Sequence, residues 1–303
     1  METRVRSPFL QLVLLFALGL GFAIVAALLM RALEVCTGLS TIHDPGLIRL
    51  AQSLTSVCAF AVPVVVWHRI TGIPARYGLC SGPQLGTNLG YPVLVMGLAI
   101  LPSALLGAIN MQVELPAWVQ AMESRAEVIL DLILGTDRLS TLMVNVLVVA
   151  VLPAVCEELL FRGAMQGIFL RWTRNGHAAV WMTAIMFSLV HMQFAGFLPR
   201  LFLGAVLGYL YLYTSTLWAP IVAHALNNAL AVSLYFALGS EAAKAQSSDE
   251  RIFGVWYLAL ISLALLVALF AHLRKRCQGQ GGDGTVSDDV SPCHADGSSS
   301  PTL

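Results

Sequence analysis

Residues 139–163 have the sequence LSTLMVNVLVVAVLPAVCEELLFRG. This stretch carries no acidic or basic side chain before Glu157, and then Glu158 and Arg162 follow within two turns of a helix. A helix needs about 20 mostly apolar residues to cross the hydrocarbon core of a membrane, so residues 139–161 predict a membrane span. An ionisable side chain inside a span costs at least ~2.5–3.5 kcal/mol on insertion scales, which makes each of the three a candidate for function.

The composition of the whole chain supports a membrane protein. Of its 303 residues, 57% are hydrophobic and 11% are charged, and the formal net charge is zero. A soluble domain carries about 25% charged and about 45–50% apolar residues, so the shortage of charge excludes an ordinary water-soluble globule and a disordered chain. The zero net charge also argues against a nucleic-acid binder.

Eight apolar stretches predict an all-α fold, a polytopic membrane bundle of about eight transmembrane helices. Their ranges are 9–30, 50–67, 89–109, 139–161, 178–192, 197–213, 217–236 and 253–273. The first stretch follows Arg4 and Arg6 and resembles a signal peptide. Because its apolar run is longer than the about 7–15 residues of a signal peptide, we expect it to be retained as a span.

Residues 116–134 predict an amphipathic helix that lies at the membrane interface rather than across it. One face of this helix is apolar and holds Trp118, Val119, Met122, Ala126, Ile129, Leu130 and Ile133. The opposite face is mostly polar and holds Gln120, Glu123, Glu127 and Asp131.

The basic residues near the span ends predict the orientation in the membrane. Of the 17 lysines and arginines, Arg162 lies inside a span and the others divide between two sides. The side that holds both termini has Arg4, Arg6, Arg69, Arg76, Arg171, Arg174, Arg274, Lys275 and Arg276. The opposite side has Arg31, Arg49, Arg125, Arg138, Arg200, Lys244 and Arg251. This modest bias, nine residues against seven, predicts that both termini are cytoplasmic and that the protein lies in the plasma membrane.

Helix geometry separates the two adjacent glutamates. Residues four apart share a face, so Glu158 lies next to Arg162 and the two predict an ion pair. Glu157 is rotated by about 100° from its neighbour and finds no cation on its own helix. A structural tie between helices accounts for the pair, whereas a lone carboxylate deep in a span favours a functional role for Glu157.

Two other spans carry buried polar residues. His191 lies four residues after Phe187, and His224 and Asn228 share one face of a later span. Together with Glu157 they supply a carboxylate, two imidazoles and a carboxamide, which are suited to activate a water molecule and to stabilise an oxyanion. The two histidines and the carboxylate are equally suited to bind a divalent metal in an open site.

The span over 197–213 contains Gly204 and Gly208, four residues apart. Two small residues at this spacing let neighbouring helices approach closely. We expect this face to pack inside the bundle against a helix that carries site residues.

At these positions the chain resembles the CPBP family, the CaaX-protease and bacteriocin-processing enzymes, which is also called the Abi family. Three motifs on separate spans carry the resemblance, and in chain order they are Glu157-Glu158-x-x-x-Arg162, Phe187-x-x-x-His191 and His224-x-x-x-Asn228. The resemblance covers roughly residues 139–230.

The resemblance implies a helical intramembrane endopeptidase whose site opens toward the cytoplasm. It implies that Glu157 and His191 activate the attacking water, and that His224 and Asn228 stabilise the oxyanion. The residues it implies as structural support are Glu158, Arg162 and Phe187.

The cofactor stays open at this point. Members of the family are commonly labelled metalloproteases, yet a metal-free glutamate mechanism has also been proposed for the fold. The sequence has no HExxH motif, and its six cysteines show no metal-ligand spacing and are expected to be isolated. A zinc ion held by Glu157, His191 and His224 is therefore one expectation, and a metal-free site, which we favour, is the other.

The implied organisation has four parts. Residues 1–138 hold N-terminal spans and the interfacial helix, 139–230 form the catalytic core, and 231–276 hold a C-terminal span. Residues 277–303, rich in Gly, Ser and Asp, predict a disordered tail.

The expected substrate is a membrane-associated protein or peptide in the lipid bilayer. Eukaryotic members of the family cut prenylated CaaX proteins, but many bacterial relatives have no known prenylated target. Two alternatives remain, a catalytically idle relative that acts as an immunity or scaffold protein and a membrane transporter. The intact motif set argues against the first, and the lack of an inverted repeat argues against the second.

Overall fold

The structure, a computed structural model, describes residues 7–41, 44–73, 89–246 and 254–280. This part of the chain is almost entirely helical and contains no strand. Seven of its helical segments are long and apolar enough to cross a membrane. The predicted polytopic helix bundle is therefore confirmed.

The helical segments in chain order are α1 (Pro8–Thr37), α2 (Pro45–Ser56), η1 (Val57–Ala61), α3 (Val62–Thr71), α5 (Gly90–Met111), α6 (Ala117–Leu134), α7 (Leu139–Asn145), η2 (Val146–Val151), α8 (Leu152–Glu158), η3 (Leu159–Met165), α9 (Gln166–Thr173), α10 (Gly176–Val190), η4 (Phe194–Gly196), α11 (Phe197–Thr214), α12 (Trp218–Gln246) and α14 (Trp256–Gln280).

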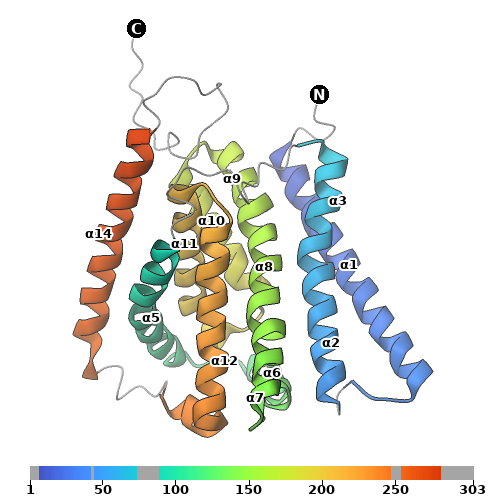
Figure 1. Cartoon of the computed structure of the whole chain (residues 1–303). Coiled ribbons are helices and arrows are strands. Elements are labelled where there is room, and N and C mark those ends of the chain that lie inside the picture. Colours follow the sequence, from blue (N-terminus) through green and yellow to red (C-terminus); the bar gives the residue numbers. More distant parts are fainter. Residues whose placement is uncertain (1–6, 42–43, 74–88, 247–253, 281–303) are drawn as a thin grey trace.

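The spans run up and down between the two ends of the bundle (Figure 1). α1 begins and α14 ends at the same end. The eight predicted stretches correspond to the seven long segments and to the shorter apolar helix α10. An even number of passages accounts for the shared end of α1 and α14.

Two of the spans are continuous rods built from several segments. Pro45–Thr71 joins α2, η1 and α3, and Leu139–Thr173 runs from α7 to α9. Pro63 and Pro153 lie just after the π-helical turns η1 and η2. A proline lacks the N–H that would bond to the carbonyl four residues earlier, and a wide turn absorbs that missing bond. The third π-helical turn, η3, has no such proline and holds Arg162.

α10 is the shortest of these eight passages. Its 15 residues span ~22 Å at 1.5 Å per residue, against a hydrocarbon thickness of ~30 Å. The side chain of Asn175 caps its first turn by accepting a hydrogen bond from the amide of Ala178. Because α10 ends at Val190, the following residue, His191, lies at the depth of the bundle interior.

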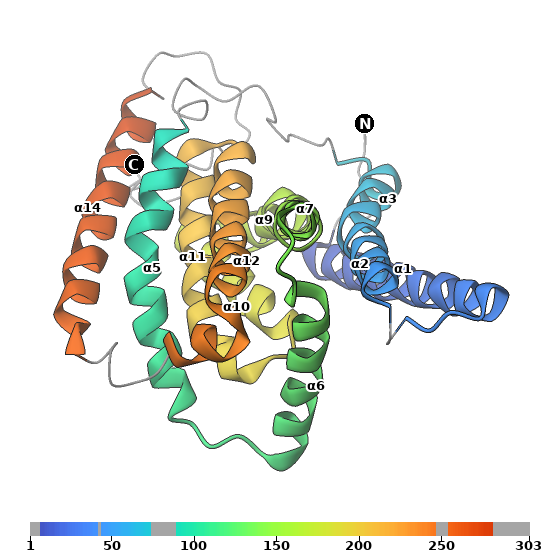
Figure 2. The same cartoon turned by 60° about the horizontal axis from the view of Figure 1, so that its bottom comes forward.

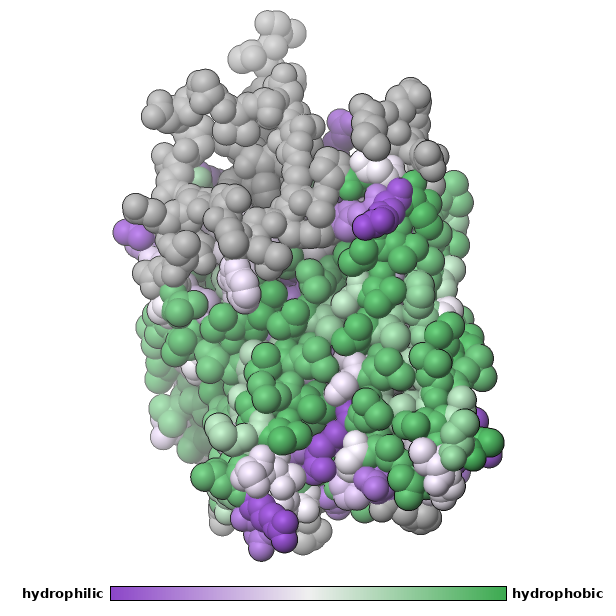
Figure 3. Space-filling model, turned by 45° about the vertical axis from the view of Figure 1, so that its right-hand side comes forward, coloured by the Kyte–Doolittle hydropathy of each residue, from purple (hydrophilic) through white to green (hydrophobic). Residues whose placement is uncertain are grey.

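Apolar side chains dominate the middle of the face shown in Figure 3, and hydrophilic residues gather toward its ends and in a patch in its lower half. The outermost helices expose large apolar side chains, for example Leu20 and Leu28 on α1 and Ile261 and Leu265 on α14. Such broad apolar exposure fits contact with lipid acyl chains, which offer no hydrogen-bond partners to a side chain.

α6 lies across the end of the bundle opposite the start of α1 (Figures 1 and 2). The helix predicted over 116–134 is therefore present and crosswise to the spans. Two acidic residues of its polar face, however, form hydrogen bonds with other parts of the protein. Glu123 accepts a hydrogen bond from the amide of Ala195 at 2.7 Å, and Asp131 accepts one from the hydroxyl of Tyr235. These two contacts bind α6 to the body of the protein.

Two expectations about the chain's C-terminal part need correction. α14 continues to Gln280, so the first residues of the tail predicted over 277–303 are helical, while 281–303 lie outside the described residues. Cys36, Cys58 and Cys156 are free, as expected, but Cys277 is disulfide-bonded.

Candidate active site

The rod from α7 to α9 carries the acidic motif at its centre. Glu157 and Glu158 are the last two residues of α8, and Arg162 lies in the wide turn η3. Glu158 and Arg162 are 0% exposed and Glu157 is 8% exposed. Arg162 Nη1 donates to Glu158 Oε1 at 2.7 Å, which confirms the ion pair predicted from their spacing.

Arg162 also ties its rod to α11. Its Nη2 donates to the carbonyl oxygen of Gly204 at 2.8 Å, and one turn later Gln166 Nε2 donates to the carbonyl oxygen of Gly208 at 3.1 Å. Two side chains four apart on one helix thus bond to two carbonyls four apart on the other. Gln166 is a contact that was not predicted from the sequence, although its spacing from Arg162 matches the spacing of the two glycines.

The two glycines are also the point where α11 contacts α10. A Cβ atom on Gly204 would lie 3.2 Å from the Cα of Ala184 and 3.3 Å from a ring carbon of Phe187. A Cβ on Gly208 would lie 2.9 Å from Val180 Cγ1. α11 therefore packs against the helix that leads to His191, as its small-residue face predicted.

His224, on α12, lies between the two glutamates. Its Nδ1 is 2.8 Å from Glu158 Oε1, and its Nε2 is 3.8 Å from Glu157 Oε2. Glu158 is therefore bonded both to Arg162 and to His224 through the same oxygen, Oε1, which joins the structural pair to the site itself. This contact is not visible in the sequence, because the two residues are 66 positions apart.

His191 approaches Glu157 from the other side. Its Nε2 is 3.8 Å from Glu157 Oε2, and its Nδ1 lies 2.7 Å from the carbonyl oxygen of Phe187. The ring of Phe187 packs edge-on against both imidazoles, with centroids 4.8 Å from His191 and 5.7 Å from His224. It also lies under the guanidinium of Arg162, 5.1 Å from Cζ to the centroid. Phe187 thus packs against His191, His224 and Arg162.

The hydrogen-bond partners indicate where the imidazole protons lie. A carbonyl oxygen only accepts, so Nδ1 of His191 carries the proton and its Nε2 presents a lone pair to the site when the ring is neutral. Glu158, as a carboxylate, likewise accepts a hydrogen bond from the N–H at Nδ1 of His224. His224 Nε2 can then donate a hydrogen bond only when the ring is protonated.

The Oε2 atom of Glu157 has no hydrogen-bond partner within the described residues. This buried atom faces both Nε2 atoms at 3.8 Å, which is beyond hydrogen-bond length. The side chains of His191 and Glu157 remain 27% and 11% exposed. One small molecule between these atoms would lie within hydrogen-bond reach of both groups.

Asn228 lies one turn after His224 on α12 and is partly buried. In the described part of the chain its side-chain oxygen accepts a hydrogen bond from Asn227 Nδ2 at 3.3 Å. No direct bond joins it there to Glu157 or His191. The structure thus brings together all the predicted site residues except Asn228, which shares only the helix and face of His224.

A loop that follows His191 was not singled out from the sequence. Met192 has a positive φ of 52°, and Arg200 Nη1 then donates to the carbonyl of Gln193 at 2.8 Å. Asn110 on α5 bonds to this loop twice, through the Phe194 carbonyl and the Leu198 amide. Arg200 Nη2 also donates to the side-chain oxygen of Gln193 at 2.9 Å. The sequence signal that could have identified Arg200 is its position as a charged residue inside the apolar stretch 197–213.

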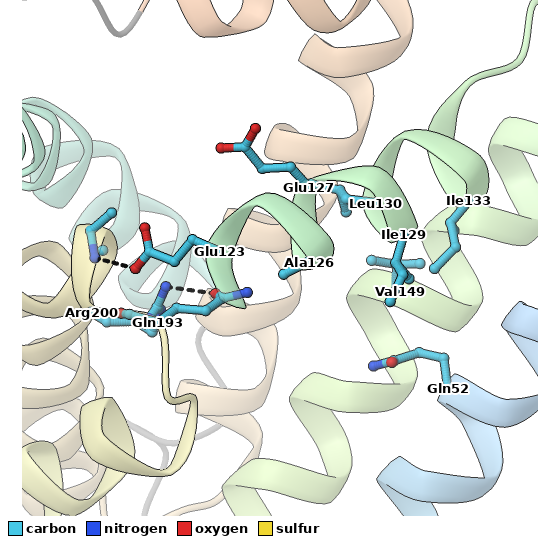
Figure 4. Close-up of a pocket in the computed structure, with 12 residues that line it drawn as sticks. Gln52, Glu123, Ala126, Glu127, Ile129, Leu130, Ile133, Val149, Gln193 and Arg200 are labelled. Carbon is cyan, nitrogen blue, oxygen red and sulfur yellow. Dashed lines mark hydrogen bonds between the residues drawn. The ribbon is translucent and has the colours of Figure 1, made fainter. Parts of the chain in front are cut away.

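A cavity of about 510 Å³ lies beside this loop, at the α6 end of the bundle. It is lined by Gln52, Glu123, Ala126, Glu127, Ile129, Leu130, Ile133, Val149, Gln193, Ala195, Gly196 and Arg200 (Figure 4). This end is opposite the one that holds the start of α1. If this cavity opens to the cytoplasm, the termini lie on the other side of the membrane. A cytoplasmic opening through this cavity is therefore incompatible with the predicted cytoplasmic termini.

The donor set was tested for a metal ion. The two Nε2 atoms and a carboxylate are suitable zinc ligands, and each histidine has a partner on its other nitrogen, as zinc-binding histidines have. As placed, however, no group of three or more His, Cys, Asp or Glu side chains in the described ranges is arranged to hold a metal ion. The chemistry considered below therefore uses protein groups alone.

A comparison with known protein families matches the segment that carries the candidate site. Residues 139–230 match the profile of a family described as "Type II CAAX prenyl endopeptidase Rce1-like". The chain is also 23% identical over 184 residues, 60% of this chain and 71% of the relative, to a Bacillus subtilis (strain 168) protein named "Putative membrane peptidase YdiL". No solved structure matches. The matched segment contains all three motifs, and these matches support the resemblance of residues 139–230 to the CPBP family.

Proposed function

We propose that this chain is an intramembrane endopeptidase of the CPBP type, which hydrolyses a peptide bond in a membrane-associated protein or peptide. The observation that carries the proposal is the position of Glu157 Oε2, which is buried, unpaired within the described residues and 3.8 Å from the Nε2 atoms of both His191 and His224. A carboxylate in a helix bundle is costly to place, and here two basic groups face it without saturating it.

The attacking water lies between Glu157 Oε2 and His191 Nε2. Glu157 takes a proton from this water while the oxygen attacks the carbonyl carbon of the peptide bond. The neutral His191 accepts a hydrogen bond from the same water through its Nε2 lone pair and orients it. Glu157 then returns the proton to the amine that leaves when the C–N bond breaks.

The oxyanion forms on the opposite side of the carbonyl carbon. Protonated His224 donates from Nε2, and its charge is stabilised by Glu158 at 2.8 Å from Nδ1. Asn228 supplies the second donor from the next turn of α12, with Asn227 orienting its amide. Donors fixed in this way before the reaction are worth most where water is excluded.

The rest of the organisation follows the same proposal. Residues 139–230 form the catalytic core, 1–138 and 231–276 supply the surrounding spans, and Glu158, Arg162 and Phe187 hold the site together. We place the protein in the plasma membrane. A prenylated CaaX protein is one possible substrate class, alongside a transmembrane or interfacial peptide without a lipid.

Purified protein in detergent micelles tests the proposal. A lipidated CaaX peptide and a transmembrane peptide are incubated with the parent chain and with Glu157→Gln, and products are identified by mass spectrometry. Cleavage by the parent and not by the variant supports the proposal. Intact peptides in both samples, with folded protein, contradict it.

The same assay with a strong chelator decides the role of a metal. Activity that survives chelation is expected for a site of protein groups alone. Loss of activity together with stoichiometric zinc, and its return with added zinc, would replace the water activation described above with a metal-dependent one.

A further inference from the structure

The loop between α10 and α11, residues 191–196, is held by two helices that lie outside the matched segment 139–230. His191 is its first residue, so we call it the His191 loop. Asn110 on α5 and Glu123 on α6 both bond to its backbone or to the residues directly after it. Neither residue belongs to the three motifs that carry the family resemblance.

Asn110 bonds to this region at two points through one amide group. Its Nδ2 donates to the carbonyl oxygen of Phe194 at 2.8 Å, and its Oδ1 accepts from the amide of Leu198 at 2.8 Å. The Leu198 amide is one of the first N–H groups of α11, which have no carbonyl partner within their own helix. The N-cap residue of α11, Gly196, has no side chain to supply one. Asn110, which is 5% exposed, therefore caps α11 from another helix.

Glu123 holds the middle of the loop. Its Oε1 accepts a hydrogen bond from the amide of Ala195 at 2.7 Å (Figure 4). Arg200 donates to the carbonyl and to the side-chain oxygen of Gln193 at 2.8 and 2.9 Å. Three successive residues, 193–195, thus each have a backbone group bonded to a side chain.

The same loop fixes the end of α10, where His191 lies. Ser188, in the last turn of α10, donates from Oγ to the carbonyl oxygen of Phe197 at 2.8 Å. Met192, directly after His191, has a φ of 52°. This left-handed conformation is unfavourable for a residue with a Cβ and persists only where the surrounding contacts enforce it. The bonds to the loop supply such contacts, so their loss releases the backbone that carries the imidazole.

The proposed water activation depends on where this imidazole lies. His191 Nε2 is 3.8 Å from Glu157 Oε2, and a water molecule between them must lie within hydrogen-bond length of both atoms. A misplacement of ~1 Å caused far from the chemistry can cost about 10²-fold in rate. Residues that hold the loop are therefore expected to affect the rate through His191.

We propose that Asn110 and Glu123 are positioning residues for His191, which hold its loop so that Nε2 faces Glu157. They act through the backbone of the loop and not on the substrate. This proposal rests on the proposed function and adds to it two residues outside the segment 139–230. α5 and α6 then contribute to the reaction as well as surrounding the core.

Hydrogen exchange measures the hold on the loop without any need for activity. The full-length parent and Asn110→Ala in detergent are compared by mass spectrometry on peptides that cover residues 191–200. Exchange there should be about 5–10-fold faster in the variant, because local opening becomes easier when one or two hydrogen bonds are lost. Ser262→Ala is the control, since it removes a bond from α14 to the Leu98 carbonyl of the same helix α5. Unchanged exchange over 191–200 in Asn110→Ala would overturn the proposal.

Steady-state kinetics tests whether the loop acts on the rate. Asn110→Ala and Glu123→Ala should lower kcat by about 10–10²-fold with little change in KM, whereas Ser262→Ala should match the parent. Glu123→Gln should recover most of kcat, because its side-chain oxygen still accepts from the Ala195 amide. A rise in KM without a fall in kcat, or no recovery in a folded Glu123→Gln, would overturn the proposal.

The parent chain separates failure of this proposal from failure of the proposed function. No cleavage of any peptide by the folded parent contradicts the peptidase, and the exchange experiment still measures the hold on the loop. Cleavage by the parent, with parent-like kcat in both Asn110→Ala and Glu123→Ala, contradicts the positioning role and leaves the peptidase supported.

Discussion

The two adjacent glutamates lie in opposite kinds of surroundings. Glu158 Oε1 lies 2.7 Å from Arg162 and 2.8 Å from His224, and Arg162 in turn bonds to the backbone of Gly204. Glu157 Oε2 has no hydrogen-bond partner within the described residues and lies 3.8 Å from the Nε2 atoms of both His191 and His224. Glu158 thus has one oxygen with two close partners, whereas its Oε2 and the Oε2 of Glu157 have no hydrogen-bond partner within the described residues.

This difference separates structure from chemistry on one helix. A buried charge with close partners stabilises the packing of three helices, and removing a partner strands it. A buried carboxylate with a free oxygen is available to a water molecule or a substrate. The predictions that follow test whether this division holds.

The largest effect is expected for Glu157→Gln, because the amide cannot take a proton from water. Turnover should fall by about 10²–10⁴, while the thermal midpoint in detergent stays near that of the parent, since Oε2 makes no hydrogen bond within the described residues that could be lost. Glu158→Gln is the comparison and should lower the thermal midpoint. If Glu157→Gln cleaves like the parent and Glu158→Gln does not, the roles of the two acids are reversed.

Arg162→Ala should act mainly on stability. It leaves Glu158 as a buried carboxylate without its cation, which costs about 3–5 kcal/mol at such pairs, and it removes the bond to the Gly204 carbonyl. Denaturation in detergent measures the loss, with Arg125→Ala on the exposed side of α6 as the control. A variant as stable as the parent but inactive would place Arg162 in the chemistry instead.

Asn228→Ala should lower kcat by about 10²–10³, the usual loss for one oxyanion donor, with little change in KM. The neighbouring Asn227→Ala is the matched control and should lose less, because Asn227 acts only by orienting Asn228. Steady-state kinetics on one peptide measures both. Equal losses in the two variants would contradict a direct contact between Asn228 and the oxyanion.

The smallest of these effects is expected for Gly204→Leu. The new side chain overlaps Ala184 and Phe187, and overpacking of this kind costs about 1–3 kcal/mol. Because α10 leads directly to His191, activity should fall together with the thermal midpoint. Gly97→Leu on α5, where a Cβ meets no atom within 4 Å, is the control. Parent-like stability and activity of Gly204→Leu would show that the contact is unimportant.

Much of the fold follows from apolar runs alone. The eight stretches and the interfacial helix over 116–134 appear where the sequence predicted them, because a polar backbone in lipid must form helices. The ends are less well determined: α14 extends past residue 276, and α10 ends before 192. These limits depend on packing and capping rather than on hydropathy.

The sequence predicted candidate site residues but not the contacts between them. Helix periodicity on one rod gave the bond between Glu158 and Arg162, which lie four residues apart. It gave no hint that Glu158 also bonds to His224, or that Gln166 reaches Gly208. Contacts between helices depend on tilt and rotation, which the sequence of one helix does not specify.

The orientation in the membrane shows the same limit. Nine basic residues against seven predict cytoplasmic termini, but the cavity beside His191 lies at the opposite end of the bundle. The count of basic residues predicts which end of the bundle faces the cytoplasm. It carries no information about where a cavity forms. Labelling of single cysteines placed near Thr37 and near Thr173 measures which end is cytoplasmic.

The sequence by itself determined that this chain is a membrane helix bundle with costly ionisable groups on three spans, because those properties depend on composition and on spacing within one helix. The tertiary structure decided which carboxylate bonds to Arg162 and His224, which nitrogen of each histidine faces the site, and where a cavity meets α6. Those properties depend on distances between residues that are tens of positions apart. These residues come within a few ångströms of one another through the close packing at Gly204 and Gly208, the short α10 and the wide turn at Arg162.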